Sequence, residues 1–170
     1  MRALNEELLV GNTCFGCGPD NPEGLRIRVL PDGDRTDRLV GTFDPRPTMV
    51  GFPLIVHGGL QFTALDCMAA WCVFALRARG VAVVPLTKSA SMRYLRAARI
   101  GTRLLLTAEI VGEPATPKEP LLIKASVLDE AGGLLSEADF EYVMLPQERF
   151  KKLVGIDVMP DSYRRHFGEI

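Results

Sequence analysis

The chain has 170 residues, of which 47% are hydrophobic and 24% are charged, a size and composition that suit one compact globular domain. Its 20 basic and 21 acidic side chains leave a formal net charge of -1, which excludes the broad positive field that nucleic-acid binding depends on. We therefore expect a single domain over residues 1–170 and no nucleic acid as a partner. Residues 1–24 would form a lead-in segment, and residues 146–170 a C-terminal tail.

Neither a secretory signal nor a membrane span is expected. The first ten residues include Glu6 and Glu7 and lack the combination of a basic start, an apolar stretch and a small-residue cleavage site. The most apolar stretch, residues 60–76, contains Thr63 and Asp66, which favours a buried core helix. The protein is therefore expected to be cytoplasmic, with no membrane partner.

The first third of the chain predicts turns and short strands. Residues 12–24 are crowded with Gly, Pro, Asn and Asp, so they should form an ordered, turn-rich segment. Two strands and the turn between them are expected next, over residues 25–30, 38–43 and 31–34. Residues 45–53 are expected to form a loop.

One long helix is predicted in the middle of the chain. Residues 59–79 contain no proline and are rich in Leu, Phe, Ala, Met, Trp and Val, and Gly80 marks the expected end. Because the stretch is apolar almost all round, the helix should be covered on nearly every side.

After Gly80 the hydrophobic period changes to two, which predicts strands. They are expected over residues 87–93, 103–111, 121–128 and 134–145, and residues 129–133 should join the last two as a hairpin. In the first of these strands, Thr87 should share a face with Ser89 and Ser91. Short helices are expected in the tail, over residues 147–153 and 161–167.

This order of elements indicates an α+β fold, in which a curved antiparallel sheet wraps around one long central helix. Both periodicities are satisfied by that arrangement, because the strands alternate and the helix is apolar on nearly every side.

The stretch from His57 to Asp66 carries the strongest chemical signal. Gly58 and Gly59 at a helix start allow close approach of a substrate and present unpaired backbone N–H groups at the positive end of the helix dipole. Such a donor stabilises an oxyanion by roughly 3 kcal/mol in other enzymes. Asp66 lies about two turns further along, where lost hydration costs several kcal/mol unless the carboxylate is paired or hydrogen-bonded. The residues alone support either a catalytic carboxylate or one that binds a buried donor.

His57-Gly58-Gly59, with Asp66 following on a long apolar helix, resembles the hotdog-fold acyl-CoA thioesterases of the 4-hydroxybenzoyl-CoA thioesterase superfamily, in particular the phenylacetate-degradation branch. The resemblance extends over about residues 12–145 and includes the run that begins Cys14-Phe-Gly-Cys-Gly-Pro-Asp-Asn-Pro-Glu-Gly-Leu25.

That resemblance implies hydrolysis of an acyl-CoA thioester by a homodimer or homotetramer. Gly58, with Gly59 beside it, would polarise the thioester carbonyl, and Asp66 from the partner subunit would act as nucleophile or as general base on water. Thr87 aligns with a hydroxyl that holds the water or the carboxylate in some members. His57 is a candidate site residue, and we expect it to shape the turn and hydrogen-bond the backbone in preference to acting as a base. Coenzyme A enters only as part of the substrate, so no further cofactor is expected.

The sequence departs from the family pattern at two positions. Gly51 stands where some relatives carry an Asn or Gln that orients water, and Ala70 stands where another branch has a Thr. Gly51 keeps an alternative open, a hotdog module that binds acyl-CoA without cleaving it. A hydratase is a poorer fit, because His57 is followed directly by two glycines.

Cations dominate the interval between Asp66 and Glu109, which holds no carboxylate. They are Arg77, Arg79, Lys88, Arg93, Arg96, Arg99 and Arg103. A local cationic surface suits the phosphates of coenzyme A, and we expect Arg93, Arg96 and Arg99 to bind them, the last two above all. Each residue taken singly is also compatible with a solvated position.

Cys14 and Cys17 have the spacing of metal ligands, but a tetrahedral zinc site needs two more. The chain offers only two histidines and two cysteines within the predicted helix. We therefore expect no metal site and interpret the pair as a packed turn with ordinary thiols. A redox role fits poorly, since no helix follows the pair.

Overall fold

A six-stranded antiparallel sheet dominates the structure, a computed structural model that describes residues 2–116 and 119–167. Its order is β1-β2-β6-β7-β8-β5, which places β1 and β5 at the two edges. The strands are β1 (Arg28–Pro31), β2 (Arg38–Phe43), β5 (Val83–Tyr94), β6 (Leu104–Gly112), β7 (Leu121–Leu128) and β8 (Leu134–Pro146).

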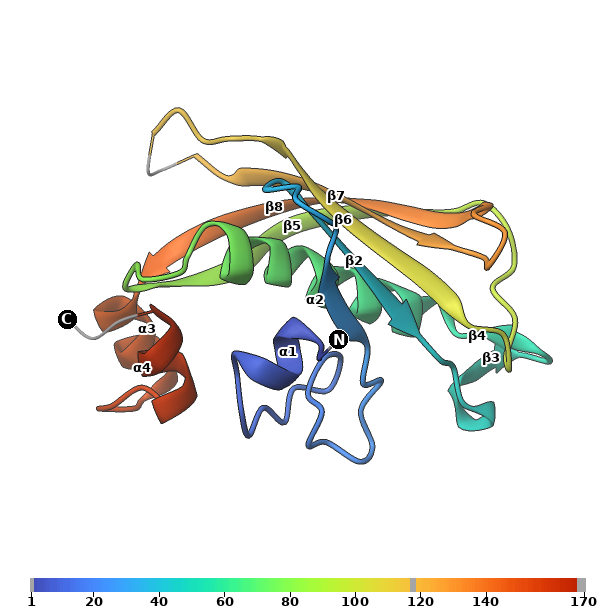
Figure 1. Cartoon of the computed structure of the whole chain (residues 1–170), viewed down its shortest axis with the longest axis horizontal. Helices are drawn as coiled ribbons and strands as arrows, with labels where there is room; N and C mark the ends of the chain where they lie inside the picture. Colours follow the sequence, from blue (N-terminus) through green and yellow to red (C-terminus); the bar gives the residue numbers. More distant parts are fainter. Residues whose placement is uncertain (1, 117–118, 168–170) are drawn as a thin grey trace.

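The sheet curves around helix α2 (Gly58–Leu76), so the predicted α+β arrangement is confirmed (Figure 1). The fully buried side chains of α2 include Leu65, Met68 and Trp71, which join the inward residues of the strands in one core. By length and composition α2 also qualifies as a membrane span, but 50% of that stretch is buried inside the protein. The helix ends at Leu76, before the predicted end, because Arg77 caps it and donates from its guanidinium to the Leu76 carbonyl.

The N-terminal segment covers the side of α2 that faces away from the sheet (Figure 1). Its short helix α1 (Leu4–Glu7) carries the buried Asn5, whose Nδ2 donates to the carbonyls of Cys17 (2.7 Å) and Ile27 (3.0 Å). The Val29 backbone N–H donates in turn to Asn5 Oδ1 at 3.0 Å. One buried amide therefore fixes the lead-in segment against β1.

The prediction of a loop over residues 45–53 was wrong in part. This region contains a short 3-10 helix, η1 (Pro47–Met49), and a two-stranded sheet of β3 (Val50–Phe52) and β4 (Ile55–Val56). Strands of two or three residues are too short to show alternation in a sequence, which explains the miss. The first predicted strand also starts later than expected, since the N–H groups of Leu25 and Ile27 bond to the lead-in instead of a strand.

A β-bulge in β5 corrects the predicted face of Thr87. Thr87 is paired with Tyr142 and Ser89 with Glu141, so Lys88 is an extra residue on β5. A bulge of this kind shifts the alternation by one residue. Thr87 therefore lies on the inner face with Tyr142, whereas Ser89 lies on the outer face.

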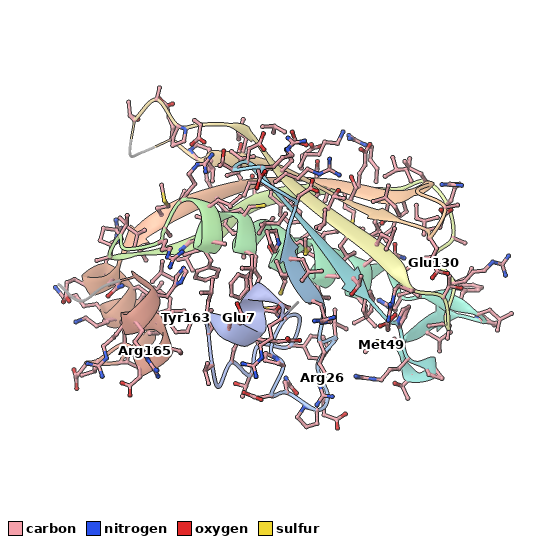
Figure 2. The ribbon with its side chains drawn as sticks, viewed as in Figure 1. Glu7, Arg26, Met49, Glu130, Tyr163 and Arg165 are labelled. Carbon is pink, nitrogen blue, oxygen red and sulfur yellow. The ribbon has the colours of Figure 1, made fainter. Side chains whose placement is uncertain are left out.

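The C-terminal tail contains the two predicted helices, α3 (Gln147–Val154) and α4 (Asp161–Phe167). Tyr163 of α4 lies on the side of the molecule that also holds the N-terminal segment with Glu7 (Figure 2). Its ring packs edge-on against Phe74 of α2, with centroids 6.2 Å apart. The tail thus packs on the end of the core, while the assignment of the whole chain to one domain stays a prediction.

Candidate functional site

Asp66 lines a cavity of about 200 Å³ in the middle of the molecule. The cavity lies between α2, the start of β5, the end of β8, the lead-in segment and α4. Its wall includes Cys67, Ala70, Trp71, Thr87, Tyr142 and Tyr163. The side chain of Asp66 is partly exposed, so it meets the cavity while remaining within an apolar helix.

Two hydroxyl groups hold one oxygen of the Asp66 carboxylate. Thr87 Oγ1 donates to Asp66 Oδ1 at 2.7 Å, and the Tyr142 hydroxyl lies 2.8 Å from the same oxygen and 2.8 Å from the Asp66 carbonyl. Among the described residues, Asp66 Oδ2 has no hydrogen-bond partner. One carboxylate oxygen is thus fixed and the other is left for a molecule in the cavity.

Tyr142 was missed as a site residue by the sequence. Its place on the inner face of β8 was predicted. From sequence alone, however, an inward-facing tyrosine is interpreted as a core residue, because the partner of its hydroxyl is not known. Burial, followed by the nearby Asp66 charge, raises the pKa of Tyr142 well above its usual range. The phenol therefore stays protonated and serves as a donor to the carboxylate.

The start of α2 has the geometry of a capped helix. His57 is the N-cap residue, and its Nδ1 accepts from the Gly59 backbone N–H at 3.0 Å. The Gly58 N–H has no acceptor among the described residues, whereas its carbonyl accepts from the Tyr94 hydroxyl at 2.9 Å. Of the two glycines, only Gly58 therefore offers a free N–H to a ligand.

Packing also explains why glycines stand beside His57. A Cβ at Gly58 would lie 3.2 Å from the Tyr94 ring, and one at Gly59 would lie 3.2 Å from the His57 ring. A Cβ at Gly51 would lie 2.9 Å from His57 Cα. The close approach of His57 thus excludes a water-orienting amide at position 51.

Gly58 and Asp66 of one chain do not meet. Eight residues of α-helix separate them by about 12 Å along the axis. A single carbonyl group cannot contact both, so a site that uses the Gly58 N–H and the Asp66 carboxylate together needs two copies of the chain.

The predicted cationic surface is largely neutralised by ion pairs. Arg93 pairs with Glu137 and Asp139 on the outer face of the sheet. Arg96 donates to the Leu134 carbonyl at 2.7 Å and lies 3.7 Å from Asp129. Arg77, Lys88 and Arg103 also have carboxylate partners.

Arg99 differs from its neighbours. It is exposed and has no carboxylate partner among the described residues. Its backbone pairs with Ile55 of β4, close to the start of α2. Of the three predicted phosphate ligands, Arg99 is therefore the one whose charge is available.

The structure brings Cys67 of α2 against the Cys14 and Cys17 pair, which the sequence did not predict. The pKa of Cys14 is held far below its usual range by hydrogen bonds from Cys17 and Cys67 and from the backbone N–H groups of Cys17 and Gly16. The pKa values of Cys17 and Cys67 are raised, chiefly because both thiols act as donors to Cys14.

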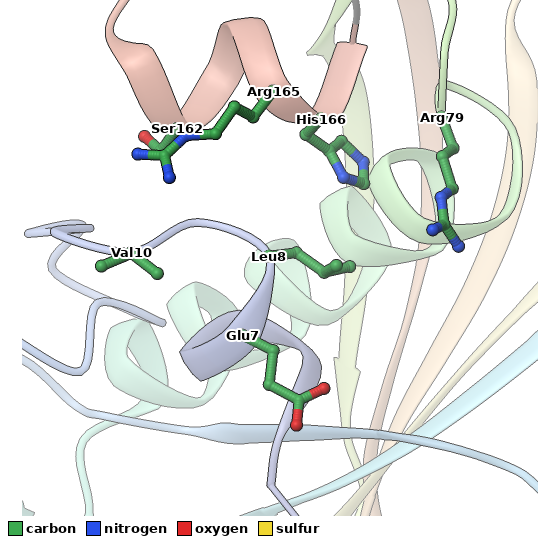
Figure 3. A pocket seen from close by; sticks show the side chains of 7 residues that line it. All are labelled: Glu7, Leu8, Val10, Arg79, Ser162, Arg165 and His166. Atoms are coloured by element: carbon green, nitrogen blue, oxygen red, sulfur yellow. The ribbon is translucent and has the colours of Figure 1, made fainter.

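A second cavity, of about 190 Å³, lies between α1, α4 and the end of α2 (Figure 3). Its wall is formed by Glu7, Leu8, Val10, Arg79, Ser162, Arg165 and His166. None of the predicted site residues lines it, so the cavity beside Asp66 is the candidate functional site.

The comparisons with known proteins fit this architecture. Residues 55–112 match the family model described as the thioesterase superfamily. This segment contains the start of α2, Asp66 and Thr87. No curated protein matches the chain.

Solved structures superpose on most of the chain. A hypothetical thioesterase from Streptococcus pneumoniae TIGR4, crystallised with coenzyme A, gives a TM-score of 0.60 at 19% identity and covers 71% of this chain and 87% of that one. The E. coli PaaI protein from the phenylacetic acid degradation operon gives 0.60 at 16% identity, with 71% and 80% covered.

The chain has the hotdog fold. A third structure, smu.793 from Streptococcus mutans UA159 bound to acetyl CoA, agrees with a TM-score of 0.56 at 17% identity, covering 65% of this chain and 82% of that one. The resemblance to hotdog thioesterases is thus confirmed, and the central helix and curved sheet are those of the hotdog fold.

Proposed function

We propose that this hotdog protein hydrolyses an acyl-CoA thioester to a free acid and coenzyme A. The observation that carries the proposal is the Asp66 carboxylate, which lines a cavity. Its Oδ1 is held by two hydroxyls, and its Oδ2 has no hydrogen-bond partner among the described residues. An ionisable group inside an apolar helix is costly, and such groups occur where chemistry needs them. Two similar structures support the substrate class, the hypothetical thioesterase from Streptococcus pneumoniae TIGR4 with coenzyme A and smu.793 from Streptococcus mutans UA159 bound to acetyl CoA.

In the proposed reaction, Gly58 of one subunit donates its free N–H to the thioester oxygen and polarises the carbonyl. Asp66 of the partner subunit acts through Oδ2, as a base that takes a proton from water or as a nucleophile. In the first version, hydroxide adds to the carbonyl carbon, the C–S bond breaks, and the thiolate of coenzyme A receives the proton. In the second, Asp66 Oδ2 attacks the carbonyl carbon, the C–S bond breaks and the thiolate of coenzyme A leaves. Water then hydrolyses the acyl anhydride to the free acid, which regenerates the Asp66 carboxylate and supplies the proton that the thiolate takes up.

Only the version in which Asp66 is the nucleophile passes through a covalent intermediate, the acyl anhydride of Asp66. Quenching the enzyme during turnover and measuring its mass would reveal an acyl group on Asp66 only if the carboxylate attacks directly. The chemistry needs no additional cofactor in either version. We place the reaction in the cytoplasm, where acyl-CoA is available.

Arg99 is our proposed ligand for the phosphates of coenzyme A, because it is exposed and has no described carboxylate partner. A guanidinium suits phosphate because its N–H groups match the spacing of phosphate oxygens. Arg99 lies near the start of α2 through the bridge to Ile55, on the side where the carbonyl would be polarised.

The decisive experiment replaces Asp66 by asparagine, which keeps the shape and removes the charge. We expect kcat to fall about 100-fold or more, the scale of losing a general base or nucleophile, with CoA-ester binding retained. Released thiol would be measured over a panel of acyl-CoAs. Asp157→Asn, at an exposed position that does not line the cavity, is the matched control. Wild-type turnover by Asp66→Asn would instead support an acyl-CoA-binding module without catalysis.

A further inference from the structure

Three cysteine sulfurs from distant parts of the chain meet at the wall of the cavity beside Asp66. The Sγ atoms of Cys14, Cys17 and Cys67 all lie within 4.8 Å of one another, and those of Cys14 and Cys67 are 3.8 Å apart. Two sulfurs bound to one tetrahedral zinc ion at about 2.3 Å are separated by about 3.8 Å. The closest pair therefore already has the spacing of two ligands on one metal.

The turn that presents Cys14 and Cys17 is built for this approach. A Cβ at Gly16 would collide with Cys67 Sγ, and a Cβ at Gly18 would lie 2.5 Å from the Cys14 backbone nitrogen. The Ile27 N–H donates to the Gly16 carbonyl at 3.1 Å, which anchors the turn to the chain that enters β1. Only glycines permit such a tight turn so close to α2.

Nitrogen donors lie beside the sulfurs. Asn12 Nδ2 donates to Cys17 Sγ at 3.6 Å. Trp71 lines the same cavity, is 1% exposed, and has an indole N–H without a hydrogen-bond partner among the described residues. Donors of this kind stabilise metal-bound thiolates by offsetting their negative charge.

We propose that Cys14, Cys17 and Cys67 bind a zinc ion as thiolates, with water from the adjoining cavity as the fourth ligand. The three thiols release their protons on binding, and no oxidation or reduction is involved. Zinc suits a site of thiolates in tetrahedral geometry. Among the described residues, no histidine or carboxylate ligand atom joins the group, so the protein supplies three ligands.

The ion would fasten the lead-in segment to α2 and form part of the wall next to Asp66. This proposal reverses our expectation from the sequence, which found only two histidines and two helix cysteines as candidates for further ligands and predicted no metal site. The third ligand lies far along the chain, on a helix whose apolar composition suggested a core thiol. The zinc site does not depend on the proposed hydrolysis.

The test measures metal binding by the reduced, metal-free full-length protein. Zinc would be titrated and quantified by mass spectrometry, and cobalt would be added separately because thiolate-bound cobalt has characteristic absorption. We expect about one ion per chain, with cobalt bands typical of a tetrahedral thiolate site. Cys14→Ser and Cys67→Ser should lower the affinity more than about 100-fold, beyond the effect of losing an outer hydrogen bond.

Cys72→Ser is the matched control, because Cys72 is buried on the same helix but bonds to the Ala108 carbonyl at 3.2 Å, outside the cluster. It should bind zinc like the wild type. Cys14 is exposed, so Cys14→Ser is expected to fold, which circular dichroism would verify. EDTA should lower the melting temperature of the wild type and Cys72→Ser but not that of Cys14→Ser.

Two outcomes would overturn the zinc site. One is the absence of stoichiometric zinc and cobalt binding in the reduced wild type, and the other is an equal loss of binding in Cys72→Ser and Cys67→Ser. Asp66→Asn should keep its zinc whether or not it hydrolyses thioesters. The zinc site and the proposed hydrolysis can therefore fail separately.

Discussion

Asp66 is stabilised by an arrangement that leaves it chemically available. Thr87 and Tyr142 both donate to Oδ1, which compensates in part for the water that the carboxylate loses within the helix. Because Oδ2 has no described partner, the fixed oxygen orients the free one. The two hydroxyls are therefore positioning groups for Asp66.

Removing one of these hydroxyls should slow turnover without weakening substrate binding. For Tyr142→Phe we expect kcat to fall about 10- to 100-fold with KM little changed, the range for losing a hydrogen bond that orients a functional group. Tyr163→Phe, which removes the hydroxyl of another tyrosine that lines the same cavity, is the control. Thr87→Ser should keep activity, whereas Thr87→Val should lose it. Equal kcat values for Tyr142→Phe and the wild type would show that the phenol only packs.

At the scale of single elements, the segment after β5 carries two arginines with different surroundings. One has a structural hydrogen-bond partner, and the other has none among the described residues. Arg96 binds the Leu134 carbonyl at the start of β8, and Arg99 follows with its charge exposed. The two positions look alike in the sequence, but within the described part of the chain only Arg96 has a hydrogen-bond partner for its guanidinium, which is why we propose Arg99 for the phosphates.

Alanine substitutions should therefore have different effects at the two sites. Arg99→Ala is expected to raise KM for a CoA thioester about tenfold, and to leave KM for a short thioester without the nucleotide unchanged, since one charge-assisted hydrogen bond contributes about 1.5–3 kcal/mol. Arg96→Ala should instead lower the free energy of unfolding by about 1 kcal/mol. Kinetics with both substrates and urea denaturation distinguish these effects. An equal rise in KM for both substrates in Arg99→Ala would remove Arg99 from the phosphate site.

The longer helices and strands were predictable because each spans enough residues for its hydrophobic periodicity to be recognised in the sequence. The bounds of β2, β7 and α4 match the prediction, as does the hairpin between β7 and β8, and α3 ends one residue later than predicted. The bulge at Lys88 was not predictable, since an inserted residue changes the face of Thr87 without changing composition. The meeting of Cys67 with Cys14 was hidden for a different reason, because contacts between distant segments have no local signal.

Within the candidate site, the sequence identified Asp66 and the start of α2 through their chemistry and spacing. Their roles remain predictions. Tyr142 could not be identified in the same way, because its hydroxyl is informative only once β8 is placed over Asp66. The predicted cationic surface between Asp66 and Glu109 was also misleading. Ion pairs such as Arg93 with Glu137 form between strands that are distant in the chain, so the sequence does not show that the charges are neutralised.

For the whole molecule, the edge strand β5 and nearby exposed apolar residues favour a second copy. Unpaired edges invite pairing with another chain, and Phe52 and Leu54 are 73% and 69% exposed. The cavity of about 200 Å³ is also smaller than the usual 300–1,000 Å³ of small-molecule pockets. A homodimer, or a tetramer built from such dimers, would complete the site.

Mixing two inactive variants tests that shared site. Gly58→Pro removes the proposed carbonyl donor, and proline fits the backbone at the first position of a helix, although its Cβ requires the Tyr94 ring, 3.2 Å away, to shift by a few tenths of an ångström. We expect Gly58→Pro and Asp66→Asn to be inactive alone and to regain about a quarter of wild-type activity when refolded together, since half of the dimers are mixed and one of their two sites is intact. Light scattering would establish the assembly, and activity would be measured by thiol release. If verified mixed dimers regain no activity, the Gly58 N–H of one subunit and the Asp66 carboxylate of its partner do not act in one shared site.

Helix α2 has a further consequence for how the protein is made. It is apolar nearly all round, yet the strands that cover it include β6, β7 and β8, all of which follow it in the chain. During synthesis the helix leaves the ribosome well before these strands exist, so its apolar surface stays uncovered. Release of the chain before β8 should therefore yield a product that aggregates or is held by a chaperone.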